Sequence, residues 1–157
     1  MKRNIVIVVL MAAVVLMSCG STSSLSNALS TAASANSTAK TMGSSCGSAL
    51  VNLYKAYKAN GKKINMSDAN VWSNALALSS SMAGLKDNGK NSDYRKSYIA
   101  GMLLGSAGTL TQTSATNVYD NMLNSLGSLT GLSSSSSSTA KSNAASALST
   151  ILGLMGN

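Results

Sequence analysis

Three glycines recur at spacings of four and three residues in the stretch Tyr98-Ile99-Ala100-Gly101-Met102-Leu103-Leu104-Gly105-Ser106-Ala107-Gly108. Each glycine costs roughly 1 kcal/mol in the interior of a helix, so a helix that keeps several needs a compensating interaction. The compensation that we expect is a neighbouring helix whose backbone approaches closely over the glycines. The uncharged stretch from residue 99 to residue 110 is too short to cross a bilayer as a helix.

Four segments between residues 44 and 130 place apolar side chains at the 3.6-residue period of a helix: 48–60, 68–83, 92–110 and 114–126. Asn60-Gly61 is a stop signal after the first segment, and Ser67 is the expected N-cap of the second. Strand signals are poor, because β-branched residues are few and do not alternate with polar ones. The pattern predicts an all-α fold, a small antiparallel bundle of about four helices joined by short connections. The second segment has the clearest stripe: Val71, Ala75, Leu78, Met82 and Leu85.

The chain begins with Lys2 and Arg3 and continues with 13 apolar residues, from Ile5 to Met17. Two cations before an apolar run are typical of a secretory signal, and 13 residues are short of the roughly 20 that span a bilayer. Residues 1–18 are therefore predicted to be a signal peptide. Residues 19–43, rich in Ser, Thr and Ala, are predicted to be a flexible tether, because they have little apolar surface to bury.

The end of the leader, Leu16-Met17-Ser18-Cys19, resembles the lipobox of bacterial lipoproteins, although methionine is a less usual residue at its second position. The resemblance implies that Cys19 is diacylated and becomes the first residue of the mature protein. Gly20 follows where an aspartate would favour retention at the inner membrane, so the resemblance implies an outer-membrane lipoprotein that faces the periplasm. The alternative is an ordinary signal peptide or an uncleaved anchor, with Cys19 incidental.

The second cysteine, Cys46, has no intrachain partner if Cys19 carries lipid. We expect it to be buried as a small apolar group, and an intermolecular disulfide is the alternative. If the lipobox interpretation is wrong, the two cysteines can pair with each other.

The C-terminal part, residues 131–157, begins with a serine-rich linker that contains six consecutive serines, 133–138. An amphipathic tail follows, which could dock on the bundle, lie on a membrane or bind another chain. Its apolar residues have helical spacing: Ala144, Leu148, Ile151, Leu152 and Met155. The helical domain itself is expected to span residues 44–130.

The composition excludes most catalytic chemistry. The chain has no histidine, and its four acidic residues are single aspartates at positions 68, 87, 93 and 120. No pair is spaced for acid–base catalysis and no set is suited to a metal ion. Phosphate-binding and dinucleotide-binding motifs are absent from the sequence. We predict no catalytic residue, no metal and no cofactor, and expect a protein that is not an enzyme. A hydrolase that uses Ser or Tyr with Lys is left open.

The densest positive charge is formed by Lys55, Lys58, Lys62 and Lys63, at the predicted end of the first helix. One interpretation is that cations suit a helix C-terminus and keep a small domain soluble. The other is a docking patch for an anionic partner, namely lipid headgroups, lipopolysaccharide phosphates or peptidoglycan carboxylates. A second basic cluster, Lys86, Lys90, Arg95 and Lys96, is expected at the opposite end of the bundle. Secretion argues against nucleic acid as a partner of either cluster.

The leading functional hypothesis is a non-enzymatic lipoprotein, anchored in the cell envelope through Cys19, that acts as an interaction or structural module. One alternative is a membrane-active or defence-type protein whose uncharged tail and glycine-rich helix insert in bilayers. Another is a carrier with a small-molecule pocket lined by Met82, Met102 and Met122. Tyr54, Tyr57, Tyr94 and Tyr98 are interpreted as residues of helix interfaces rather than as a ligand platform.

Overall fold

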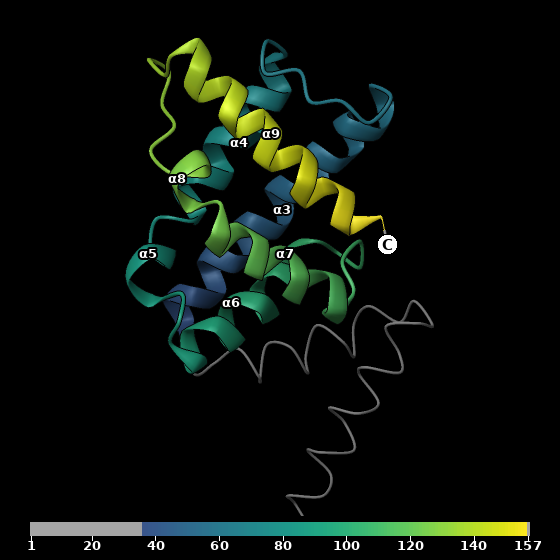
Figure 1. Ribbon diagram of the computed structural model, residues 1–157. Helices are drawn as coiled ribbons and strands as arrows, with labels where there is room; N and C mark the ends of the chain where they lie inside the picture. The colour runs from purple at the N-terminus through teal and green to yellow at the C-terminus, as the bar shows by residue number, and fades with distance from the viewer. Residues whose placement is uncertain (1–35, 157) are drawn as a thin grey trace, which may run out of the picture.

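The computed structural model describes residues 36–156, and over this range the protein is built from helices without strands (Figure 1). The predicted all-α class is confirmed. The helices are α3 (Ser37–Ala59), α4 (Ala69–Ser81), α5 (Leu85–Asn88), α6 (Ser92–Gly105), α7 (Gln112–Asn124), α8 (Leu126–Leu129) and α9 (Ser138–Met155).

Helix α3 is the centre of the bundle and packs against α4, α6 and α9. It is antiparallel to α4, as two contacts show. In the second half of α3, Asn52 donates a 3.1 Å hydrogen bond to Asn74 of α4. In the first half of α3, Cys46 lies beside Ser81 at the end of α4. It runs in the same direction as α6, because Gly43 lies on Tyr98 and Gly47 lies on Met102. Helices α3 and α4 are thus antiparallel, while α3 and α6, which pack most closely, are parallel.

The contact between α3 and α6 is made by two glycines from each helix, spaced four residues apart. A Cβ atom added at Gly43 or Gly47 would collide with the carbonyl oxygen of Tyr98 or Met102, and one added at Gly101 or Gly105 would collide with that of Lys40 or Ser44. The predicted close approach over Gly101 and Gly105 is confirmed. Gly108 has another role, because it follows α6, has a φ of +86° and faces open space.

The first helix begins earlier than the sequence indicates. Asn36 is its N-cap, accepting a 2.9 Å hydrogen bond from the Ala39 amide, so residues 37–43 are helical rather than part of a tether. Ala39 and Gly43 are buried, so these residues belong to the packed domain. Glycine is a poor helix former in isolation, and at Gly43 and Gly47 the contact with α6 overrides that preference.

The other helix ends also differ by a few residues from those expected. Asp68, not Ser67, caps α4, and its carboxylate accepts hydrogen bonds from the Asn70 and Val71 amides. Helix α6 is capped by Asn91 and ends at Gly105, well before residue 110. Helix α7 begins at Gln112 through a capping box of Thr111 and Ser114. The apolar stripe of the second segment is buried along its whole length, as predicted: Val71, Ala75, Leu78, Met82 and Leu85.

The C-terminal tail docks on the bundle, which decides between the three alternatives left by the sequence. Helix α9 packs against α7 and α8 and also contacts α3; Figure 1 shows it running above α7. Its apolar stripe is buried, and the Nζ atom of Lys141 lies 4.7 Å from the centre of the Trp72 ring. The serine-rich segment is tied down as well, because the Leu132 amide donates a 3.2 Å hydrogen bond to the Ser79 hydroxyl. The packed domain therefore extends over residues 36–156.

Within residues 36–156, no helix combines the length and the hydropathy needed to span a membrane.

Replacing Gly47 by Ala tests the contact between α3 and α6. We expect Gly47→Ala to lower the free energy of unfolding by about 2 kcal/mol, because the added methyl group meets backbone that cannot rotate away. Gly127→Ala is the matched control: its Cβ would face open space, so the gain in helix propensity leaves stability unchanged or raised. Urea unfolding followed by circular dichroism measures both. A Gly47→Ala variant as stable as the control would contradict the proposed role of the contact.

Candidate functional site

The C-terminus of α3 ends abruptly in a tight turn, and this turn positions the four lysines that the sequence singles out. Helix α3 ends at Ala59, and Gly61 and Lys62 both have a φ of +62°. The Lys62 amide donates a 2.8 Å hydrogen bond back to the Tyr57 carbonyl, the bond that characterises a Schellman motif. Glycine adopts a positive φ readily, but lysine does so at a cost. The chain therefore holds a lysine in a backbone conformation that glycine would adopt more favourably.

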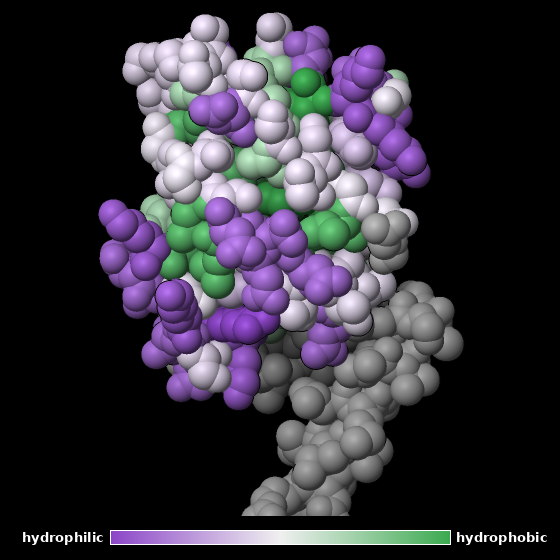
Figure 2. All heavy atoms as spheres, viewed as in Figure 1, coloured by the Kyte–Doolittle hydropathy of each residue, from purple (hydrophilic) through white to green (hydrophobic). Residues whose placement is uncertain are grey.

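We call Lys55, Lys58, Lys62 and Lys63 the cationic end of α3; all four side chains are exposed. None of them takes part in an ion pair within the part of the chain that the structure describes, where the salt bridge is between Arg95 and Asp120. The nearest acidic residue in sequence, Asp68, uses its carboxylate to cap α4. The cationic end thus carries four charges that no described acidic side chain compensates. Figure 2 shows hydrophilic residues at this end of the molecule, at the upper right, and also over the opposite end, around α5 and the start of α6.

Two tyrosines on α3 lie next to these lysines and pack against the protein. The rings of Tyr54 and Tyr57 are half-buried and stacked, with centroids 6.5 Å apart. The Nζ atom of Lys58 lies 5.6 Å from the centre of the Tyr54 ring, within the range of a cation–π interaction. A Cβ atom on Gly156, just after α9, would lie 3.1 Å from the Tyr54 hydroxyl. The base of the cationic end is therefore packed against the C-terminal end of α9.

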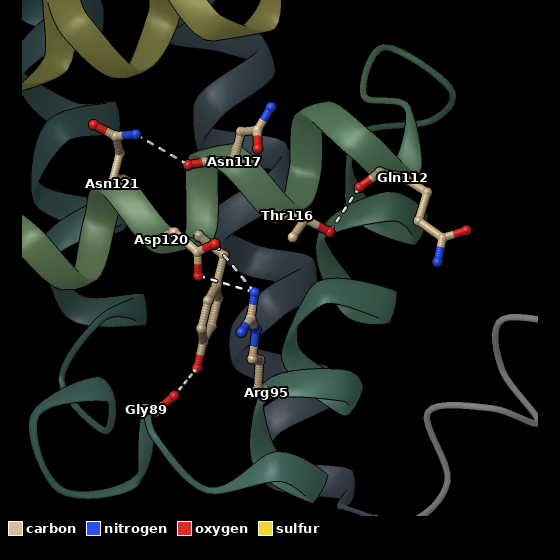
Figure 3. A network of polar contacts seen from close by, with 8 residues as sticks. Gly89, Arg95, Gln112, Thr116, Asn117, Asp120 and Asn121 are labelled. Carbon is tan, nitrogen blue, oxygen red and sulfur yellow. Dashed lines mark hydrogen bonds and ion pairs between the residues drawn. The ribbon is translucent and has the colours of Figure 1, made fainter.

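The second basic cluster lies at the opposite end of the bundle, around α5 and the start of α6 (Figure 1). Its arginine is used within the fold: the Arg95 guanidinium lies 2.9 Å from an Asp120 carboxylate oxygen and 5.6 Å from the centre of the Tyr119 ring (Figure 3). The hydroxyl of Tyr119 in turn donates a 2.8 Å hydrogen bond to the Gly89 carbonyl. These contacts join α6, α7 and the turn after α5, so Arg95 stabilises this corner of the fold.

Polar side chains form a row along α7 (Figure 3): Gln112, Thr116, Asn117, Asp120 and Asn121. This row was not identified from the sequence, although a spacing of three and four residues between such side chains indicates one face of a helix. Two of them bond within the helix: the Thr116 hydroxyl donates to the Gln112 carbonyl, and the Asn121 amide donates to the Asn117 carbonyl. These bonds satisfy the side chains locally, so the row is a solvated helix face.

The tyrosines, methionines and free thiol singled out in the sequence lie in or against the core. Tyr94 and Tyr98 are buried, as expected for interface residues, and the Tyr98 hydroxyl donates a 3.0 Å hydrogen bond to the Ser81 carbonyl. Cys46 is fully buried and free, with its Sγ atom 3.8 Å from the Met122 Sδ atom. Burial raises the pKa of the Cys46 thiol to about 12. Three methionines are fully buried in the same cluster: Met82, Met102 and Met122.

The described residues offer no constellation for metal binding, since no three His, Cys, Asp or Glu side chains in residues 36–156 are grouped to hold an ion. Cys19, the residue predicted to carry lipid, lies outside the described residues. The cationic end of α3 is therefore the candidate interaction site for which the structure provides geometry.

Replacing Lys62 by Gly tests the strained turn. We expect Lys62→Gly to raise the free energy of unfolding by up to about 1 kcal/mol, because glycine adopts the positive φ without a steric penalty. The neighbouring Lys63→Gly removes the same charge but does not relieve a positive φ, and we expect it to be neutral or destabilising. Thermal unfolding compares the two variants. Equal effects of the two substitutions would show that charge, not backbone conformation, decides the result.

The buried thiol predicts slow alkylation of native Cys46. In the chain from residue 20 onward, where Cys46 is the only cysteine, we expect iodoacetamide to label the unfolded protein rapidly and the native protein very slowly. Because the pKa of the Cys46 thiol is higher in the folded protein than in the unfolded one, ionisation of this thiol favours unfolding. The free energy of unfolding should therefore fall as the pH rises above the ordinary thiol pKa of 9.0 toward about 12. Mass spectrometry of the labelled protein measures the first effect and urea unfolding the second. Rapid labelling of the folded protein near neutral pH would contradict the burial.

No protein-family model, no curated protein and no solved structure matches this chain.

Proposed function

We propose that this protein is a lipid-anchored, non-enzymatic module of a bacterial cell envelope, held at the periplasmic face of the outer membrane through Cys19. The observation that carries the proposal is the sequence Leu16-Met17-Ser18-Cys19 behind two cations and a short apolar run. In this proposal the helical domain presents the cationic end of α3 to an anionic component of the envelope.

The length of chain before the bundle suits such an anchor. Residues 20–35 lie between Cys19 and the N-cap Asn36, and 16 residues can span at most about 55 Å. If they behave as a flexible chain, their root-mean-square extension is roughly 20–25 Å. A domain attached in this way could stand clear of the lipid headgroups and still remain close to its membrane.

The chemistry of the described residues supports a binding role over a catalytic one. The chain has no histidine, its buried thiol has a pKa far above neutrality, and no metal-binding group is formed within residues 36–156. What the domain offers a partner is exposed positive charge on a well-packed helical scaffold. Long-range attraction by such charge steers association and makes it dependent on ionic strength.

The competing hypothesis, insertion of α9 into bilayers, requires the bundle to open first. The apolar stripe of α9 is buried against α7, α8 and α3, so the docked helix has no free apolar face of its own. Leakage of dye from phospholipid vesicles on addition of the folded protein would favour that hypothesis over the one proposed here.

Replacing Cys19 by Ala tests the lipid anchor. We expect Cys19→Ala to abolish labelling by a fatty-acid analogue and to move the protein from the membrane fraction, because the acceptor thiol is lost. Cys46→Ala is the matched control, since it removes the other cysteine and leaves the lipobox intact. Cell fractionation and metabolic labelling of both variants provide the measurement. Unchanged labelling and membrane association of Cys19→Ala would refute the anchor.

A further inference from the structure

We propose that the partner of the cationic end of α3 is a carboxylate-bearing polymer on the side of the protein away from its own membrane, as peptidoglycan is, and not a membrane surface. The inference rests on the proposed lipid anchor, which attaches the domain through the chain that enters the bundle at Asn36. Three features of the structure support it: the position of the lysines along α3, the lack of exposed apolar side chains around them, and their freedom from intramolecular ion pairs.

The position of the lysines follows from the length of α3. The chain enters the bundle at Asn36, and α3 then runs for 23 residues, about 35 Å, before it reaches the cationic end. No helix break lies within it, so its first turn and its lysine-rich last turn are at opposite ends of the domain (Figure 1). A domain anchored through the segment before Asn36 therefore carries these lysines at the end of α3 opposite to the one where the chain enters.

The apolar residues near the lysines are turned into the protein. Tyr54, Tyr57, Ile64 and Met66 are only partly exposed and pack against the hydrophobic core. The turn itself, residues 60–63, has the sequence Asn-Gly-Lys-Lys and is exposed. Proteins that dock on membranes usually add apolar or aromatic side chains that enter the headgroup boundary. Here the surface offers charge without such insertion, which suits a hydrated polymer better than a bilayer.

The ammonium groups of the four lysines are free to bind an anionic partner, and each acts as a compact single charge. No described acidic side chain pairs with the four lysines. Lys86, Lys90 and Lys96 at the other end of the bundle are likewise without a described ion pair, and only Arg95 there is held by Asp120. A lysine ammonium on a flexible stem binds single carboxylates without the paired geometry that an arginine fork requires. Several lysines on one helix end can therefore engage carboxylates that are repeated along a polymer, and the interaction weakens as salt is added.

Co-sedimentation with insoluble peptidoglycan tests the proposal, using the chain from residue 20 onward, which keeps every described residue. We expect wild-type protein to sediment with peptidoglycan and to be released at high ionic strength. The affinity of the quadruple variant for peptidoglycan should be lower by a factor of about ten or more. Its substitutions are Lys55→Gln, Lys58→Gln, Lys62→Gln and Lys63→Gln. Amidation of the peptidoglycan carboxyl groups should abolish binding by the wild-type protein.

The matched control removes the same charge from the other end of the domain, in the variant Lys40→Gln, Lys86→Gln, Lys90→Gln and Lys96→Gln. Binding by this control at close to the wild-type level would support the proposal, and circular dichroism confirms that both variants are folded. Equal loss in both variants would overturn it in favour of net charge alone. Binding to vesicles of anionic phospholipid or to lipopolysaccharide, but not to peptidoglycan, would overturn it in favour of a membrane surface. Because residue 19 is absent, the outcome is independent of lipidation, which the Cys19→Ala experiment judges separately.

Discussion

The direct backbone contact between α3 and α6 is the constraint on which the rest of this fold depends. Two helices can approach until the backbone of one meets the carbonyl oxygens of the other only where side chains are absent. Each helix supplies two glycines, at 43 and 47 and at 101 and 105. At this separation the Ser48 hydroxyl also donates a 3.1 Å hydrogen bond to the Gly105 carbonyl across the interface. Packing at such short range gains dispersion energy over many atoms, which offsets the poor helix propensity of glycine.

The row of small residues on α6 continues beyond the glycines. Ser97 precedes Gly101 by four residues and is fully buried. Its hydroxyl is the buried side-chain oxygen without a hydrogen-bond partner in the described part of the chain. Leaving such a group unsatisfied costs on the order of 1–3 kcal/mol. Serine is therefore best explained at this position by its small volume, since the polar group gains no partner in the structure.

The same contact has a consequence for function. Helix α3 packs against α6 in its N-terminal half, over Gly43 and Gly47, and also against α4. It is one uninterrupted helix from Ser37 to Ala59, just before the last two lysines of the cationic end. A long helix that is packed on several sides keeps its two ends at a fixed distance. The point where the chain enters the bundle and the lysines are therefore about 35 Å apart. The strained backbone at Lys62 completes the arrangement, because it turns the chain within two residues and leaves the charged side chains exposed.

The sequence by itself determined the helical class, the apolar stripes of α4 and α9, and the need for a neighbour over Gly101 and Gly105, because periodicity and helix propensity are local properties. The signal-like leader and the lysine cluster are likewise properties of the sequence. Only the tertiary structure decided that Gly43 and Gly47 lie inside a helix, that α9 is docked, and that α3 and α6 run in the same direction. The contact between α3 and α6 joins residues more than 50 positions apart, and local propensity at Gly43 and Gly47 favours a loop. Close packing reversed that preference.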